Sequence, residues 1–227
     1  MKQKYSSKEL REKMKQDELE LLLEGTGAWF RRYGQALLVG TVIVVAGVLG
    51  YYLYQNHEKG QNEEAVKAYN AAAMDLSRGN TEQAALAFDR LAQDFKATGA
   101  ASEARVAAAQ AYFEKGDYDK AKARFQQLSQ SKDSILASVG LTGLAQVAEA
   151  QGKREEAISI YKNAIDSHPD SGFVERWRYG IGYNYEKLGD KEKAVAAYRA
   201  VPDDSALKMQ AVQRLAWLLV EPRAAKS

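Results

Sequence analysis

Apolar residues follow two different patterns along this chain, one continuous and one periodic. Residues 36–53 read ALLVGTVIVVAGVLGYYL and contain no charged side chain. After residue 63, apolar residues instead recur at helical spacing among Lys, Glu and Gln, which is typical of amphipathic helices. The chain has only three prolines and is rich in strong helix formers. The sequence therefore predicts an all-α protein, with one long apolar helix before a helical domain.

The continuous apolar run is long enough to span a bilayer as a helix. Its length and the 35 residues before it favour an uncleaved anchor over a signal peptide, and its all-round apolar surface favours a membrane helix over a buried core helix. Arg31 and Arg32 precede the run, whereas Lys59 after it is offset by acidic residues, so we expect the N-terminus to face the cytoplasm. Aromatic residues flank both ends, as at lipid headgroups: Trp29, Phe30, Tyr33, Tyr51, Tyr52 and Tyr54.

A fourfold repeat organises the rest of the chain. A glycine that turns the chain, a small residue where two helices meet and a ring that fills the remaining gap describe a helix-turn-helix unit, and such units stack into a right-handed α-solenoid. Asp117 and Asp190 follow their glycines where they can cap the next helix. The glycines lie 37, 36 and 37 residues apart, each with alanine five and a ring nine residues later: Gly79, Ala84, Phe88; Gly116, Ala121, Phe125; Gly152, Ala157, Tyr161; Gly189, Ala194, Tyr198.

These patterns divide the chain into consecutive parts. The N-terminal part contains SSKELREKMKQDELELLLE, in which Ser6 and Glu9 have capping-box spacing, so we expect either a short amphipathic helix ended by Gly25 and Gly27 or a partly ordered charged tail. The predicted parts are a cytoplasmic tail (1–32), a transmembrane helix (33–54), a polar linker acting as a short hinge (55–62), a repeat domain of four units (63–221) and a C-terminal tail (222–227).

The last helix of the repeat domain is expected to cap the array, because a solenoid needs its terminal core covered. It is predicted over Ser205 to Val220. The sequence places these apolar residues on one face of it: Leu207, Val212, Leu215, Ala216 and Leu219.

Composition excludes several classes of function. The formal net charge is +2, with Lys and Glu interspersed, which is unlike the basic surface of a nucleic-acid-binding protein. The chain has no cysteine, and its two histidines, His57 and His168, are not spaced for metal binding or general-base catalysis. Phosphate loops, dinucleotide fingerprints and nucleophile elbows are missing from the sequence. We therefore expect neither an enzyme nor a cofactor, metal or small-molecule substrate.

The repeat units resemble tetratricopeptide repeats, with turns that read SRGNTEQA, EKGDYDKA, AQGKREEA and KLGDKEKA and small residues at the eighth position of each first helix. In that family the first helices line the concave face, and this mapping places Leu76, Val106 and Val139 there. Positions five and nine hold no Lys or Asn, which disfavours binding of a chaperone's C-terminal carboxylate. The candidate residues for binding peptides through ring faces and amides are Tyr69, Gln110, Phe113, Gln146, Arg176, Tyr179 and Tyr183. For Phe113 and Tyr179 the alternative is simple packing between helices.

The order of parts resembles the YfgM-like family of bacterial inner-membrane proteins, chiefly in WFRRYGQALLVG and YYLYQNHEKGQNEEAVKAYNAA. The resemblance implies an ancillary subunit of the Sec translocon that works with periplasmic chaperones, with the repeat domain in the periplasm. Leu19 to Leu23 and the membrane glycines Gly40, Gly47 and Gly50 would then be candidate contacts to the channel, since small residues permit close helix approach.

The leading functional hypothesis is a membrane-tethered protein that holds exported polypeptides near the translocon through its concave groove. Two alternatives stay open at the level of the sequence. One is a structural scaffold of an envelope complex for division, secretion or flagellar assembly, and the other is a membrane-bound adaptor whose repeats face the cytoplasm.

Overall fold

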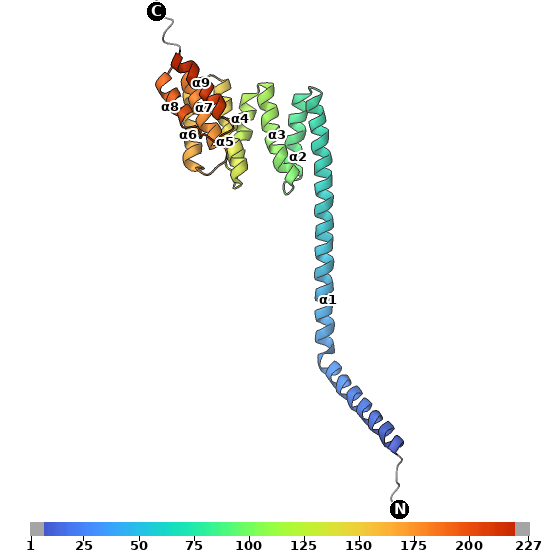
Figure 1. Ribbon diagram of the computed structural model, residues 1–227. Coiled ribbons are helices and arrows are strands. Elements are labelled where there is room, and N and C mark those ends of the chain that lie inside the picture. The colour runs from blue at the N-terminus through green and yellow to red at the C-terminus, as the bar shows by residue number, and fades with distance from the viewer. Residues whose placement is uncertain (1–6, 221–227) are drawn as a thin grey trace, which may run out of the picture. The chain divides into compact units, whose positions relative to one another are not determined.

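The computed structural model describes residues 7–220, and every regular element in this range is a helix (Figure 1). Within this range, the long α1 is followed by eight shorter helices, each of which packs on its neighbour along the chain. Their bounds are α1 Ser7–Ser77, α2 Thr81–Asp94, α3 Gly99–Lys115, α4 Tyr118–Ser129, α5 Ser134–Ala150, α6 Arg154–Ser167, α7 Val174–Lys187, α8 Lys191–Arg199 and α9 Lys208–Val220.

Helix α1 is one continuous helix, which corrects two expectations. It passes through Gly25 and Gly27, and residues 55–62, expected as a hinge, are also helical. A single glycine such as Gly60 costs a helix only about 1 kcal/mol relative to alanine, and the residues around it are acceptable helix formers. Helix already present on both sides propagates through such a site at low cost. Ser6 of the expected capping box and the tail 222–227 lie outside the described residues, as do the side chains of Leu19 to Leu23.

The chain divides into two compact units between Gly60 and Gln61. In the first unit, the apolar stretch of α1 has its side chains exposed; Leu38 and Ile43, for example, are 67% and 66% exposed. The helical segment Arg32–Ser77 is long and apolar enough to cross a membrane, and none of its most apolar 18-residue window is buried against protein. An apolar helical surface of this kind requires lipid or a partner helix to cover it.

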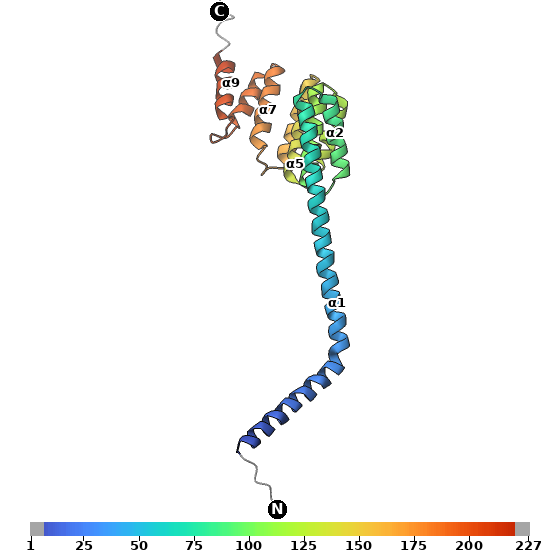
Figure 2. The same cartoon turned by 90° about the vertical axis from the view of Figure 1, so that its right-hand side faces the viewer.

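In the second unit, the end of α1 packs on α2 through Ala72 and Tyr69, and α3 pairs with α4, α5 with α6, and α7 with α8 (Figures 1 and 2). The four repeat glycines sit at the turns within these pairs, with φ between 74° and 83°, a region that other residues adopt only with strain. Asp117 accepts a hydrogen bond from the backbone N–H of Lys120, and Asp190 does the same for Lys193. The predicted turns and caps are thus confirmed.

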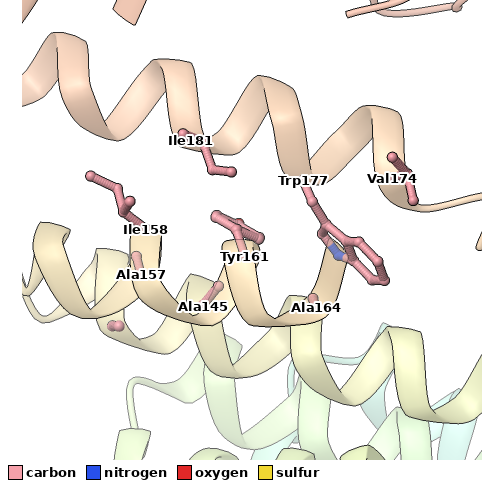
Figure 3. Close-up of a cluster of buried hydrophobic side chains, with 9 residues drawn as sticks. Ala145, Ala157, Ile158, Tyr161, Ala164, Val174, Trp177 and Ile181 are labelled. Atoms are coloured by element: carbon pink, nitrogen blue, oxygen red, sulfur yellow. The ribbon is translucent and has the colours of Figure 1, made fainter. Parts of the chain in front are cut away.

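The repeated rings and alanines form the contacts between helices. The four repeat alanines are completely buried, and the four rings Phe88, Phe125, Tyr161 and Tyr198 are at most 4% exposed. Three of the rings lie directly against a glycine on a neighbouring helix: Phe125 on Gly143, Tyr161 on Gly180 and Tyr198 on Gly182. In Figure 3, the ring of Tyr161 projects from α6 towards α7, beside Trp177. The sequence pattern therefore identified the residues that set the spacing of the helices.

A buried hydrogen-bond chain adds to the contact between the third and fourth units. The indole Nε1 of Trp177 donates to Thr142 Oγ1 at 2.8 Å, and Thr142 Oγ1 donates to the carbonyl of Ser138 at 2.7 Å. Trp177 is completely buried, so its single donor has a partner where water cannot reach it. This chain fixes the position of α7 along α5.

Helix α9 packs on the last pair as the expected capping helix does, but with a different face from the one predicted. Ala211 and Leu218 are buried, and Leu207 and Leu215 pack beside them. Val212 and Leu219, expected on that same face, are about half exposed. At about 100° per residue, these two residues point away from Ala211 and Leu218. The prediction of one apolar face was wrong because this helix is apolar on two sides.

Replacing Gly140 by alanine should destabilise the repeat domain, because the added Cβ would collide with the backbone of Leu128 and Ser129 rather than with a movable side chain. Overpacking of this kind costs about 1–3 kcal/mol. The matched control is Gly99→Ala, where a Cβ meets nothing within 4 Å and a neutral or slightly stabilising effect is expected. Chemical denaturation of the detergent-solubilised chain measures both, and equal midpoints for the two variants would contradict the packing described.

Candidate peptide-binding groove

A groove of about 510 Å³ lies on the face formed by the first helices of the first three units. Its walls come from the end of α1, from α3 and from the start of α5. Most of the lining is aliphatic. The lining residues are Tyr69, Leu76, Ser102, Glu103, Val106, Ala107, Gln110, Ile135, Leu136 and Val139.

Local structure fixes both edges of this groove. On the α1 side, the ring of Tyr69 packs on Phe88 of α2, with ring centroids 5.2 Å apart. On the α5 side, the carboxylate of Asp133 caps the helix by accepting from the backbone N–H groups of Ile135 at 2.8 Å and Leu136 at 3.2 Å. This cap holds Ile135 at the rim, where its side chain is 66% exposed. Such exposure of a large aliphatic side chain at the rim of a groove favours a binding role.

The polar groups of the groove are few. Glu103 is the single charged residue among the lining residues, and it is exposed. Gln110 is exposed too and donates to Glu114 at 3.3 Å. An aliphatic floor with an amide and a carboxylate near its rim suits the apolar side chains of an extended polypeptide whose backbone can bond to the amide.

Two of the seven predicted binding residues, Tyr69 and Gln110, line this groove. Phe113 and Tyr179 do not line it, and they follow the alternative of packing between helices. The ring of Phe113 contacts Tyr118 at 5.7 Å between centroids, and the ring of Tyr179 contacts Tyr198 at 5.4 Å. Both rings border buried core clusters. Both side chains are partly buried, so part of their area is already used in folding.

The remaining three predicted residues lie outside the lining of the groove, Gln146 further along α5 and Arg176 and Tyr183 on α7. The ring of Tyr183 has the guanidinium of Arg154 5.7 Å and the ammonium of Lys187 5.4 Å from its centroid. Arg176 is exposed, and Gln146 is partly buried. Conversely, Ile135 and Leu136 were not among the predicted residues. The signal that could have identified them is their position two and three residues after Asp133, a residue type that caps helices.

The three membrane glycines lie in the first unit, on α1. A Cβ added at Gly40, Gly47 or Gly50 would meet nothing within 4 Å. Among the described residues, then, nothing packs on these positions. Their role as contacts to a partner helix stays a prediction.

Comparison with protein families matches residues 27–218 to the family described as "Tetratricopeptide repeat-like domain". The chain belongs to the tetratricopeptide repeat-like family. Solved structures agree at the level of the fold: the structure titled "MamA 41-end from Desulfovibrio magneticus RS-1" superposes with a TM-score of 0.52 at 18% identity, covering 70% of this chain and 86% of that one.

Curated relatives of this tetratricopeptide repeat-like chain carry one common name, "Ancillary SecYEG translocon subunit". The relative from Escherichia coli (strain K12) is 27% identical over 179 residues, which is 78% of this chain and 84% of the relative. The relative from Neisseria gonorrhoeae is 25% identical over 203 residues, covering 86% and 91%. The resemblance to YfgM-like proteins inferred from the sequence is thereby confirmed over most of the chain.

A charged contact between the first two tetratricopeptide units fixes the position of α3, one of the helices that line the groove. The hydroxyl of Tyr112 donates to Asp89 at 2.9 Å, and the guanidinium of Arg124 donates to both oxygens of Asp89 at 2.7 and 2.8 Å. Burial and the adjacent Asp89 carboxylate raise the pKa of the Tyr112 hydroxyl to about 12. Bidentate pairs of this kind fix geometry as well as contributing free energy, so α3, which carries Val106, is held on α2 and α4.

This contact predicts a loss of stability at alkaline pH. The pKa of Tyr112 is about 12 in the folded state and near 10 in an unfolded chain, so between these values the unfolded state has lost a proton that the folded state keeps. The contribution of the protonated Tyr112 hydroxyl to the free energy of unfolding is present below about pH 10. It disappears as pH rises to about 12, with a slope of at most about 1.4 kcal/mol per pH unit. Tyr112→Phe should reduce the slope of unfolding free energy against pH in this window. An unchanged slope in that variant would show that the hydroxyl does not titrate as described.

Proposed function

We propose that this chain is a membrane-anchored protein-binding subunit that works beside the Sec translocon and holds apolar segments of exported polypeptides. The observation that carries the proposal is the aliphatic groove of the first three repeats, whose wall includes Tyr69 and Leu76 of α1. The same helix contains the apolar run suited to a bilayer. Anchor and binding wall are thus parts of one continuous helix.

The curated relatives support a location beside the Sec translocon. Their shared name assigns them to the SecYEG translocon as ancillary subunits, and they align with most of this chain. The family match also begins at residue 27, before the apolar run. We transfer this assignment to the present chain. The exposed glycines Gly40, Gly47 and Gly50 provide a surface on which another membrane helix can approach closely.

The aliphatic lining of the groove supports apolar, extended polypeptide segments as the ligand. Burying one Leu, Ile or Val side chain contributes about 1.5–3 kcal/mol, whereas ordering an extended segment and its side chains costs a comparable amount. A groove with room for a few such side chains therefore binds weakly and releases readily. Tethering offsets weak affinity by raising the local concentration of groove and ligand at the membrane. Weak, tolerant binding suits a protein that meets many sequences.

We further place the repeat domain in the periplasm and the N-terminus in the cytoplasm. Arg31 and Arg32 lie on the N-terminal side of the apolar run, and basic residues favour the cytoplasmic side. In this orientation the groove meets polypeptides as they leave the channel, and reversible release passes them to periplasmic chaperones. The bacterial inner membrane is the site that this proposal requires.

The groove proposal predicts the effect of one charge at its rim. Ile135→Glu should weaken binding of a fluorescein-labelled, unstructured peptide rich in Leu and Val by about tenfold or more, because it replaces an apolar contact with a carboxylate that must be desolvated. Fluorescence anisotropy with the detergent-solubilised full chain measures the dissociation constant. Because Ile135 is exposed, the variant should keep its melting temperature.

The matched control is Leu86→Glu, which places the same charge on an exposed leucine of α2 outside the groove. It should bind like the parent, and affinity in both should change little with salt, because the contacts are apolar. Equal weakening by the two substitutions, or equal binding of a peptide without apolar residues, would refute the groove as the site.

A further inference from the structure

The last helix of the array exposes an apolar face. On α9, Met209 is 69% and Val220 75% exposed, and Val212 and Leu219 are about half exposed. Ala216 is exposed between them. The terminal helix of a stable, isolated solenoid carries a polar outer face, and α9 lacks one. This surface, made of Met209, Val212, Ala216, Leu219 and Val220, is called the α9 outer face below.

The repeat itself shows what such a face binds. The last two repeat glycines are 37 residues apart. When the sequence of α9 is aligned with that of α7 by the same shift of 37 residues, Ala211 and Leu218 correspond to Val174 and Ile181, and all four are buried. In the same alignment, Ala216 corresponds to Tyr179 and Leu219 corresponds to Gly182.

On α7, the residues at those two positions hold the next helix. Gly182 lies against the ring of Tyr198 of α8, and Tyr179 contacts the same ring. The α9 outer face therefore occupies the position from which α7 binds the helix that follows it. The occupant that fits is another helix.

The chemistry of the face identifies that helix. Met209, Val212, Ala216 and Leu219 follow one another at spacings of three, four and three residues, the spacing of a coiled-coil seam. The neighbouring exposed residues are Gln210, Gln213 and Trp217, which is 49% exposed, so no charge on the face selects an oppositely charged partner. In an antiparallel pair of α9 helices related by a twofold axis, Met209 of one copy lies opposite Leu219 of the other, and Val212 lies opposite the small Ala216. The face is therefore complementary to itself.

We propose that the α9 outer face binds the same face of a second copy of this chain, with the two α9 helices antiparallel about a twofold axis. Twofold dimers with self-complementary patches are the commonest protein assemblies. A standard interface buries about 800 Å² per partner, more than one helix face supplies, so the dimer depends on confinement of both copies to one membrane. The proposal makes no use of the groove.

Crosslinking of the full chain in membrane vesicles tests this pairing, since the natural sequence has no cysteine. A mixture of copies carrying Val212→Cys and copies carrying Ala216→Cys should form a dimer with a short bifunctional maleimide, at several times the yield of Ala123→Cys. Ala123 is an exposed alanine on α4 and serves as the matched control. Equal yields, or adducts with a different membrane protein instead of a second copy, would overturn the proposal.

A second measurement separates association from folding. The double variant Val212→Glu and Leu219→Glu should raise the dimer dissociation constant in vesicles at least tenfold, measured by energy transfer between labelled copies. Its melting temperature should stay that of the parent, because both side chains are exposed. Leu86→Glu is the control for added charge and should leave the dimer intact. Unchanged energy transfer in the double variant would place any dimer contact elsewhere and refute the α9 outer face.

Discussion

The contact between an aromatic ring and a small residue on the facing helix is the constraint on which this repeat domain depends. Phe125 lies on Gly143, Tyr161 on Gly180 and Tyr198 on Gly182, with no room for a Cβ. Each buried ring contributes about 1.5–3 kcal/mol, and each glycine lets two helix backbones approach closely. Repeating this contact fixes the spacing of successive units. The first helices then line one side, and the groove is the space that their spacing leaves.

Those contacts could be predicted from the sequence because they are local and periodic. The turn glycine, the alanine and the ring recur in phase, and the caps of Asp117 and Asp190 lie one residue after their glycines. What escaped prediction depends on tertiary packing. For Phe113 and Tyr179 the sequence left binding and packing open, and their packing is decided by Tyr118 and Tyr198 on other helices. The exposed side of α9 is decided by which of its two apolar sides meets α8. Residues 55–62 are helical because helix flanks them, although their own polar composition suggested a hinge.

The groove and the later repeats differ in character. The first three units present aliphatic side chains to the groove, such as the exposed Ile135 and the partly buried Val106. In the fourth unit, polar side chains are already engaged: Asn184 donates to Glu149 at 2.6 Å, and Tyr198 donates to Glu186 at 2.8 Å. Groups that bond to one another make poor sites for varied ligands, because binding would leave them unpaired. The proposed binding of apolar segments therefore falls on the first three units, at the end of the array that follows the apolar run of α1.

The central claim is that the aliphatic groove holds segments of exported polypeptides in living cells. A photoreactive amino acid at Ile135, with the matched position Leu86 as control, tests it most directly. The account predicts adducts with many different exported proteins at Ile135, few at Leu86, and translocon subunits crosslinked from a third position, Gly47. A single recurring folded partner at Ile135, without translocon adducts at Gly47, would contradict the account and favour an assembly scaffold.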